Sequence, residues 1–258
     1  MTDLTGRTVL LTGASKGIGA ATAEAMIAAG ARLIAHYGSD RAGAEAATSG
    51  AADGQVTLVQ ADLSGPDGAE HLYAAAKEAL GSSPLDVLVN NAGIMFQTGG
   101  IEDDRDDWDK AWSTSMEVNV YSPAKLMRSV VSDWLTSDHK GSVIGIGSWV
   151  TTRGTANPGA IAYAASKAAI AAATKTVARN YADRGILAYV IAPGPVATKM
   201  SLDSAAKTGG VEAVTAGLPL GEMIPPSEIA DLAVFLASGR ARHLTGATID
   251  VNGAAYIR

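Results

Sequence analysis

The run TVLLTGASKGIG, residues 8–19, lies near the start of the chain and sets the architecture of everything after it. Its first part is short, apolar and β-branched, as buried strands are, and Gly13 ends it. Gly17 and Gly19 come next, and the Ala-rich segment that reaches about residue 29 has the composition of a helix. We therefore predict a strand, a glycine turn and a helix in direct succession.

The glycine turn is a candidate phosphate site. Without Cβ atoms the backbone can approach a pyrophosphate closely, and the free N–H groups and positive dipole end of the next helix attract it. The spacing is Gly-x-x-x-Gly-x-Gly, and such a turn alone is more often only a tight turn. Its position after the first strand favours the nucleotide.

Strands and helices alternate outward from this run. Apolar runs at residues 32–35, 55–60, 85–89, 142–146, 186–191 and 248–251 predict six more strands, with helical segments between them. This alternation predicts right-handed βαβ crossovers and a parallel sheet covered on both faces, an α/β fold. The 258 residues contain no linker, so we expect one domain over residues 1–258.

Polar residues and turn formers gather where the predicted strands end. In a parallel α/β sheet, ligands bind outside the carboxyl ends of the strands. Asp62 could meet an adenine there or cap the helix that begins near Pro66. The strand-end residues are Gly13, Tyr37, Asp62, Asn90, Ser148 and Pro193.

The end of the second strand bears on the choice of cofactor. An NAD-selective site usually places an acid there to hold the ribose 2′-hydroxyl, and this chain has Tyr37 instead. With Lys16 in the glycine turn and Ser39 and Arg41 nearby, we expect a 2′-phosphate to be preferred. The alternative is that Lys16 and Arg41 are ordinary solvated charges.

Tyr163 and Lys167 form a candidate acid–base pair. Four residues apart in an Ala-rich helical run, they share one helix face. A lysine charge within a few ångströms favours the phenolate and lowers the pKa of the phenol. The pair also occurs by chance on many helices. Its assignment as an acid–base pair therefore depends largely on the polar residues at the strand ends.

Two further segments matter for the predicted site. Asn119 lies in mid-helix, where an amide is unexpected unless it bonds backbone or water. Residues 196–224 are rich in Gly, Ser and Ala and weakly patterned, which predicts a mobile substrate lid.

Composition excludes several classes of function. The net charge of −6 and pI near 5.2 give no basic footprint for nucleic acid or anionic membrane. There is no cysteine, the four histidines lack metal-ligand spacing, and the acids at residues 103–109 suit a solvated loop and a helix N-terminus, so no metal is expected. No run approaches a membrane span or signal core, and we expect a cytoplasmic protein.

Taken together, the residues resemble the classical short-chain dehydrogenase/reductase family. The resemblance spans essentially the whole chain and rests on Thr12-Gly13-x-x-x-Gly17-x-Gly19, Asn90-Asn91-Ala92-Gly93, Asn119, Ser148, Tyr163-x-x-x-Lys167 and Pro193-Gly194. It implies a Rossmann-type, doubly wound sheet of seven parallel strands, a nicotinamide cofactor and a homo-oligomer, a tetramer or a dimer.

The resemblance also implies roles for residues. Tyr163 would be the general acid and base, Lys167 would lower its pKa and bind the nicotinamide ribose, Ser148 would orient the substrate oxygen, and Asn119 would hold a water of the proton relay. The cofactor would be lined by Gly13, Ser15, Lys16, Gly17, Ile18, Gly19, Tyr37, Ser39, Arg41, Asp62, Leu63, Asn91, Ala92, Gly93, Tyr163, Lys167, Pro193, Gly194, Val196 and Thr198.

The chain departs from the family pattern in two places. The loop between Ser148 and Tyr163 is about two residues longer than usual, which leaves Thr151 or Thr152 as a weaker alternative to Ser148. The second strand ends without an acid or a following arginine, so the preference for NADP(H) over NAD(H) rests mainly on Lys16.

These features predict an NAD(P)-dependent oxidoreductase that interconverts a secondary alcohol and a ketone, with NADPH favoured. A 3-oxoacyl-thioester reductase of the same family is an alternative, with Lys199 and Lys207 as candidates to meet the carrier. A silent NADP-binding sensor or scaffold is disfavoured, because the catalytic set is complete. The substrate stays open, although six apolar residues could form its pocket: Trp149, Met95, Phe96, Met200, Leu202 and Met223.

Overall fold

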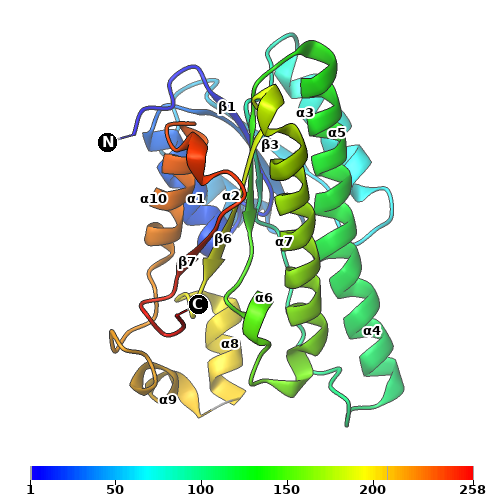
Figure 1. The fold of residues 1–258 in the computed structure, drawn as a ribbon, viewed down its shortest axis with the longest axis vertical. Coiled ribbons are helices and arrows are strands. Elements are labelled where there is room, and N and C mark those ends of the chain that lie inside the picture. Colours follow the sequence, from blue (N-terminus) through cyan, green and yellow to red (C-terminus); the bar gives the residue numbers. More distant parts are fainter. Residues whose placement is uncertain (1, 208, 258) are drawn as a thin grey trace.

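The computed structural model describes residues 2–207 and 209–257, and within them seven strands form one parallel sheet (Figure 1). The strand order is β3-β2-β1-β4-β5-β6-β7, so the winding reverses between β1 and β4. This order confirms the predicted Rossmann-type, doubly wound fold. The strands are β1 Thr8–Leu11, β2 Arg32–Tyr37, β3 Val56–Gln60, β4 Val87–Asn90, β5 Ser142–Ile146, β6 Leu187–Pro193 and β7 Thr248–Val251.

Helices cover both faces of the sheet. In Figure 1, α1, α2 and α10 lie on one side, and α3, α5 and α7 lie on the other. The helices are α1 Gly17–Ala28, α2 Arg41–Ala47, α3 Gly68–Leu80, α4 Arg105–Met116, α5 Ser122–Ser137, α6 Val150–Arg153, α7 Ile161–Tyr181, α8 Lys199–Lys207, α9 Gly210–Ala216 and α10 Pro226–Ala237. None of the helices in the described ranges is long and apolar enough to cross a membrane.

Alternate residues of a strand pack in two separate hydrophobic cores, one on each face of the sheet. Val9 and Leu11 pack in the core beneath α1 and α10, whereas Leu10 packs in the core beneath α3 and α5, and all three are fully buried. Burying a side chain of this size contributes about 1.5–3 kcal/mol. Because both faces are covered, the strands are apolar throughout, which explains why they appear in the sequence as continuous apolar runs.

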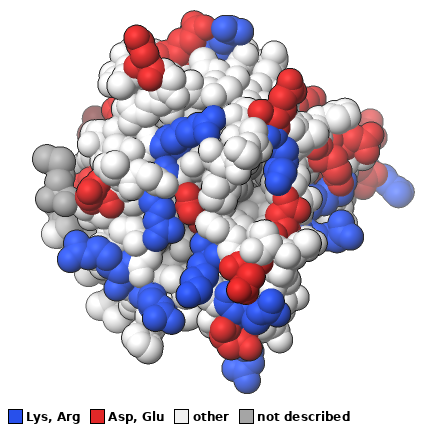
Figure 2. All heavy atoms as spheres, turned by 90° about the horizontal axis from the view of Figure 1, so that it is seen from above, with Lys and Arg blue, Asp and Glu red and all other residues white. Residues whose placement is uncertain are grey.

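The carboxyl ends of the strands lie at the bottom of Figure 1, where α6, α8, α9 and the C-terminal segment gather. The opposite face, formed around the amino ends, is seen in Figure 2, and Lys and Arg side chains are interspersed there with Asp and Glu. The buried Asp86 belongs to this edge, where it accepts a hydrogen bond from the N–H of Thr8 at 2.8 Å.

Two segments predicted as loops contain helices. The stretch after Ser148 holds α6 and a 3₁₀ turn, Pro158–Ala160. Residues 196–224 hold α8 and α9, and the described residues of α9 include none that is buried. Helices α6, α8 and α9 are only 4, 9 and 7 residues long, and the described residues of each include at most one that is buried, which is too little to give a recognisable hydrophobic period in the sequence.

The two ends of the 196–224 segment are tied together. Val196 and Ile224 form a parallel bridge. The N–H of Ala197 donates to the carbonyl of Ile224, and the N–H of Ile224 donates to the carbonyl of Pro195, each at 2.9 Å. The segment is therefore closed at its base, directly after β6.

Candidate active site

Three glycines shape the turn between β1 and α1. Gly13 and Gly17 have φ angles of +73° and +57°, which favour glycine. At Gly19 a Cβ would collide with the carbonyl oxygen of Gly13. Within this described turn the N-cap Lys16 makes no side-chain cap hydrogen bond, and the first turn of α1 has no acid. The exposed N–H groups and tight backbone fit the pyrophosphate of a dinucleotide.

Two side chains from neighbouring strands fix this turn. His36 accepts a hydrogen bond from the N–H of Gly13 at Nδ1 and donates from Nε2 to the carbonyl of Ala61, each at 3.1 Å. Burial lowers the pKa of His36, and the neutral ring is the form that this pattern requires. Asn91 donates from Nδ2 to the carbonyls of Thr12 at 2.8 Å and Gly13 at 3.1 Å. The Asn91 amide thus holds the turn, which leaves its backbone for the predicted ribose contact.

The end of β2 combines a buried phenol with exposed cations. Tyr37 has 4% of its surface exposed, while Lys16 and Arg41 are exposed beside it. Arg41 donates from Nε at 2.7 Å to a carboxylate one turn along α2. Lys16 Nζ lies 3.9 Å from Asp40 Oδ2, and such a long, exposed pair is weak. Lys16 is therefore the cation that is freer to meet a ligand.

Asp62, after β3, is held in a local turn. Its Oδ1 accepts hydrogen bonds from the backbone N–H of Ser64 at 2.9 Å and from its hydroxyl at 2.7 Å. The hydroxyl bond and then the backbone bond lower the pKa of Asp62. Helix α3 begins at Gly68 with Asp67 as its N-cap, so the alternative that Asp62 caps this helix is wrong. Leu63 is buried in the core beneath α3.

Ser148, Tyr163 and Lys167 meet at the carboxyl edge of the sheet. Lys167 Nζ lies 5.8 Å from the centre of the Tyr163 ring, which agrees with the predicted shared helix face. Ser148 follows β5, is buried, and hydrogen-bonds to the Tyr163 phenol. Thr152, one of the alternatives to Ser148, instead donates to the hydroxyl of Tyr256 at 3.4 Å.

Burial governs the protonation of this pair. It raises the pKa of Tyr163, and the hydrogen bond with Ser148 offsets only part of that rise. Burial also lowers the pKa of Lys167 to about 8, and the ammonium donates to the carbonyl of Ile146 at 2.8 Å. Burial thus acts against the lowering of the Tyr163 pKa by Lys167, because it removes a phenolate from water, and that lowering stays a prediction. The phenol keeps its proton at neutral pH.

Asn119 is buried in a π-helical turn, Glu117–Tyr121, between α4 and α5. Its Oδ1 accepts from the N–H of Ile94, and its Nδ2 donates to the carbonyl of Ile94 and to Ser166 Oγ, each at 2.9 Å. Ser166 Oγ in turn donates to the carbonyl of Tyr163 at 2.8 Å. The amide thus bonds backbone, as its mid-helix position requires, and ties the loop after β4 to α7.

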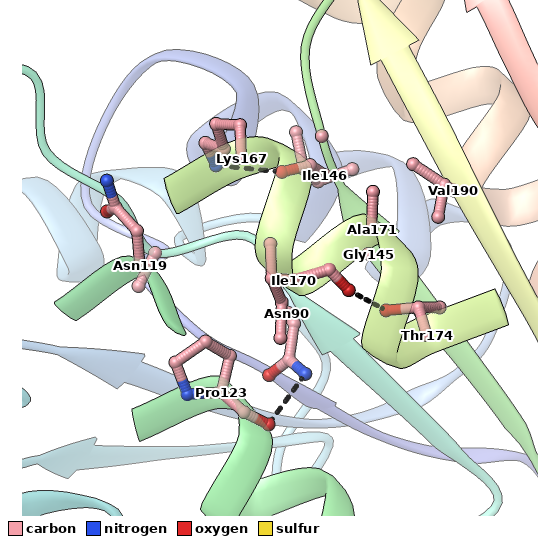
Figure 3. Close-up of a pocket in the computed structure, with 12 residues that line it drawn as sticks. Asn90, Asn119, Pro123, Gly145, Ile146, Lys167, Ile170, Ala171, Thr174 and Val190 are labelled. Atoms are coloured by element: carbon pink, nitrogen blue, oxygen red, sulfur yellow. Dashed lines mark hydrogen bonds between the residues drawn. The ribbon is translucent and has the colours of Figure 1, made fainter. Parts of the chain in front are cut away.

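A small cavity lies beside Lys167, between the sheet and α7 (Figure 3). Its free volume is about 10 Å³, close to what one water molecule needs. Asn90, Asn119 and Lys167 are among its lining residues, and Asn90 Oδ1 has no hydrogen-bond partner among the described residues. The cavity therefore suits a single, hydrogen-bonded water.

The segment after β6 reaches the glycine turn. Pro193 ends β6, and Gly194 and the buried Val196 continue from it. Thr198 then lies over Gly17, where a Cβ would meet the Thr198 methyl group at 3.0 Å. The residues predicted for the nicotinamide thus adjoin those predicted for the phosphates.

Comparisons with known proteins agree with this geometry. The sequence model of a family described as enoyl-(acyl carrier protein) reductase matches residues 13–254. The 3-oxoacyl-(acyl-carrier-protein) reductase FabG of Vibrio cholerae is 35% identical over 262 residues, which cover 99% of this chain and 99% of that protein. The 3beta-hydroxysteroid dehydrogenase 1 of Eggerthella lenta is 34% identical, with 97% and 94% covered. A solved structure described as a short chain dehydrogenase/reductase family protein has a TM-score of 0.81 and 32% identity, with 98% of each chain covered. This chain belongs to the short-chain dehydrogenase/reductase family.

As a short-chain dehydrogenase/reductase, the protein is an oxidoreductase that acts on CH–OH groups with a nicotinamide cofactor. The sequence does not predict the roles of His36, which holds the glycine turn, or of Ser166, which lies inside the Tyr-x-x-x-Lys motif. A histidine at the end of an apolar strand was the signal that could have pointed to the first.

The predicted substrate pocket is only partly assembled. Met200 and Leu202 lie on α8 and are 37% and 43% exposed. Met223 is buried and lines a second cavity at the base of the 196–224 segment, with Leu218 and Leu220. The cofactor-binding and catalytic residues of this short-chain dehydrogenase/reductase are thus better defined in the structure than the residues that would contact the substrate.

Proposed function

We propose that this protein is an NADPH-dependent reductase of ketones, which in the reverse direction oxidises secondary alcohols. The observation that carries the proposal is the meeting of Ser148, Tyr163 and Lys167 beside a glycine turn shaped for a pyrophosphate. A phenol that keeps its proton at neutral pH is in the protonation state that a general acid needs.

Each member of this set has a distinct task. The bound nicotinamide supplies the hydride. Ser148 donates a hydrogen bond that orients the substrate oxygen, and Tyr163 donates its proton to that oxygen as negative charge develops. Lys167, whose pKa is about 8, is mostly protonated at pH 7 and stabilises the phenolate that remains. Oxidation of the alcohol runs the same proton path backwards.

We further propose that protons return to Tyr163 through Lys167 and a water near Asn119. The cavity lined by both residues supports this path because its volume suits one water molecule. Lys167 would also bind the nicotinamide ribose, near residues 193–198. Residues 13–19 would bind the phosphates, Asp62 and Leu63 the adenine, and residues 91–93 the adenosine ribose.

NADPH is the proposed cofactor for two reasons. Tyr37 stands at the end of β2, where an NAD-selective site usually has an acid, and the cation Lys16 lies beside it. Lys16 is exposed and only weakly paired with Asp40, and Ser39 and Arg41 lie nearby. Lys16→Gln should raise the KM for NADPH about tenfold and leave that for NADH nearly unchanged, because only NADPH carries the 2′-phosphate. An equal rise in the KM values for NADPH and NADH would contradict the proposed contact between Lys16 and the 2′-phosphate.

The first experiment measures NADPH and NADH consumption with aliphatic, aryl and acyl-thioester ketones, with Tyr163→Phe beside the parent. Loss of the rate in Tyr163→Phe with NADPH binding retained supports the acid–base role, and equal rates in both proteins contradict it. NADPH binding without turnover of any ketone would favour a sensor or scaffold.

A 3-oxoacyl-thioester substrate is the second candidate, because the Vibrio cholerae relative is a 3-oxoacyl-(acyl-carrier-protein) reductase and the description of the matching family also refers to an acyl carrier protein. Of the lysines expected to meet a carrier, Lys199 is paired with Asp203 at 2.8 Å, which makes it less available. Preference for the acyl-thioester within the panel would select this candidate.

The resemblance also leads us to propose a cytoplasmic homo-oligomer, a tetramer or a dimer, and a substrate lid over residues 196–224. Light scattering after size-exclusion chromatography tests the assembly, and cell fractionation tests the location. Hydrogen exchange of α8 and α9 with and without NADPH tests the lid, because ligand closure should slow it.

A further inference from the structure

Arg153 is held between two aromatic rings near the proposed site. It ends the four-residue helix α6, which follows Ser148 and Trp149. Its guanidinium carbon lies 4.5 Å from the centre of the Trp149 ring and 5.7 Å from the centre of the Tyr256 ring. Residues 103 positions apart in the sequence, 153 and 256, thus meet at the carboxyl edge.

Hydrogen bonds hold the backbone of both ring-bearing residues, and one further bond reaches the Tyr256 hydroxyl. The N–H of Trp149 donates to the carbonyl of Pro193 at 2.9 Å. Tyr256 is held by Thr152, whose hydroxyl donates to the phenol at 3.4 Å, and by Asn252, whose Nδ2 donates to the Tyr256 carbonyl at 2.9 Å. The rings therefore restrict the guanidinium, so less side-chain freedom is lost when it binds a ligand.

The guanidinium lacks a carboxylate of its own. In the described part of the chain, the ion pairs engage Arg7, Arg41 and Arg105 among the arginines but not Arg153. With aromatic rings beside the planar group, its N–H groups can still reach a partner in the plane. A carboxylate matches that fork with two parallel hydrogen bonds.

The place of Arg153 in the chain determines how far its guanidinium lies from the reacting ketone. Arg153 folds back over Trp149, the residue directly after Ser148, and adjacent Cα atoms are about 3.8 Å apart. The guanidinium therefore lies on the order of 10 Å from the Ser148 hydroxyl, given a rise of about 1.5 Å per residue along α6. A chain of several carbon atoms spans that gap.

We propose that Arg153 binds a carboxylate on the substrate, several bonds from the ketone that is reduced, and that Trp149 and Tyr256 contact the intervening carbon chain. The substrate class is thus an oxo acid. This inference rests on the proposed ketone reductase activity, and it assigns Arg153 to specificity rather than to the chemical step.

The test compares matched pairs of substrates that differ only in charge: 4-oxopentanoate and 5-oxohexanoate against their methyl esters, with NADPH at low ionic strength. Arg153→Met should raise the KM for the acids about 10- to 100-fold with little change in kcat, and leave both constants for the esters within twofold. Arg153→Lys should fall between, and added salt should reduce the preference of the parent for the acids. Arg128→Met, at an exposed arginine on α5, is the control and should change nothing.

Two results would overturn the proposal. The first is equal use of acids and esters by the parent, and the second is an equal loss for both in Arg153→Met, which would make Arg153 only a packing residue. Calorimetric titration of 4-oxopentanoate into the NADP-loaded protein separates this inference from the proposed activity. Binding that Arg153→Met abolishes supports the subsite even without turnover, and absence of binding to the parent refutes it.

Discussion

Replacing Lys167 with Met should lower activity and raise stability at neutral pH. Lys167 is 6% exposed, and burial lowers its pKa from 10.5 to about 8. At about 1.4 kcal/mol per pKa unit, the buried ammonium costs the folded state about 3 kcal/mol. Met fills the same space without charge, but it leaves the carbonyl of Ile146 without its donor, which costs about 1–3 kcal/mol. The net change at pH 7 is a gain of about 0–2 kcal/mol.

The pH dependence of this difference has a definite sign. Between about pH 8 and 10.5 the unfolded chain keeps a lysine proton that folded Lys167 has released. Because the unfolded state binds more protons, the free energy of unfolding of the parent rises with pH in this window. From pH 7 to pH 10 the rise from Lys167 is about 2–3 kcal/mol, and Lys167→Met lacks it.

Urea unfolding followed by far-UV circular dichroism at pH 7 and pH 10 measures this difference. Lys175→Met, at an exposed lysine on the same helix, is the control and should keep one offset from the parent at both pH values. NADPH-linked ketone reduction by Lys167→Met should fall at least 100-fold, roughly what a positioned catalytic group supplies. The burial argument is refuted if the offset between Lys167→Met and the parent is the same at both pH values.

Gly19→Ala should weaken NADPH binding at least tenfold in a fluorescence titration, because its Cβ collides with the carbonyl of Gly13, and normal affinity would contradict the fit of the turn. The free energy of unfolding of the parent should fall as the pH drops below about 6.5, because folded His36 resists a proton that the unfolded chain accepts. Urea titrations at pH 5.5 and 7.5 should show a smaller fall in His36→Gln, and an identical fall would rule His36 out. Ser148→Ala should lower kcat roughly 10²- to 10³-fold, whereas Thr152→Ala should change it little, and comparable losses would reopen the assignment of the hydroxyl.

The strands could be predicted from the sequence because parallel strands covered on both faces are apolar along their whole length. β5 and β7 match the predicted residues 142–146 and 248–251, and the boundaries of the other strands differ from the predicted ones by at most two residues. The strand ends then brought Tyr37 and Ser148 to one edge, because carboxyl ends of parallel strands share that edge. The order of the strands along the chain was therefore sufficient to predict this part of the candidate site.

Other features depend on contacts that no local pattern encodes. The bonds from His36 to Gly13 and Ala61 join three strand ends, and the contact of the Arg153 guanidinium with the Tyr256 ring joins α6 to the C-terminal segment. The protonation of Tyr163 depends on the fold for a related reason. Helix spacing gives the distance to a charge, but the cost of burial depends on the whole fold around it.

The closed base of the 196–224 segment has a consequence for how this chain can change over generations. Two hydrogen bonds of 2.9 Å hold Ala197 and Pro195 to Ile224, so alterations between them need not disturb β6. Doubling the length of such a connection costs only about 0.6 kcal/mol in closure entropy. The part of the segment that holds α8 and α9 can therefore lengthen, shorten or be replaced while Val196 and Thr198 keep their places beside the glycine turn, and new specificities can arise by exchange of that part alone.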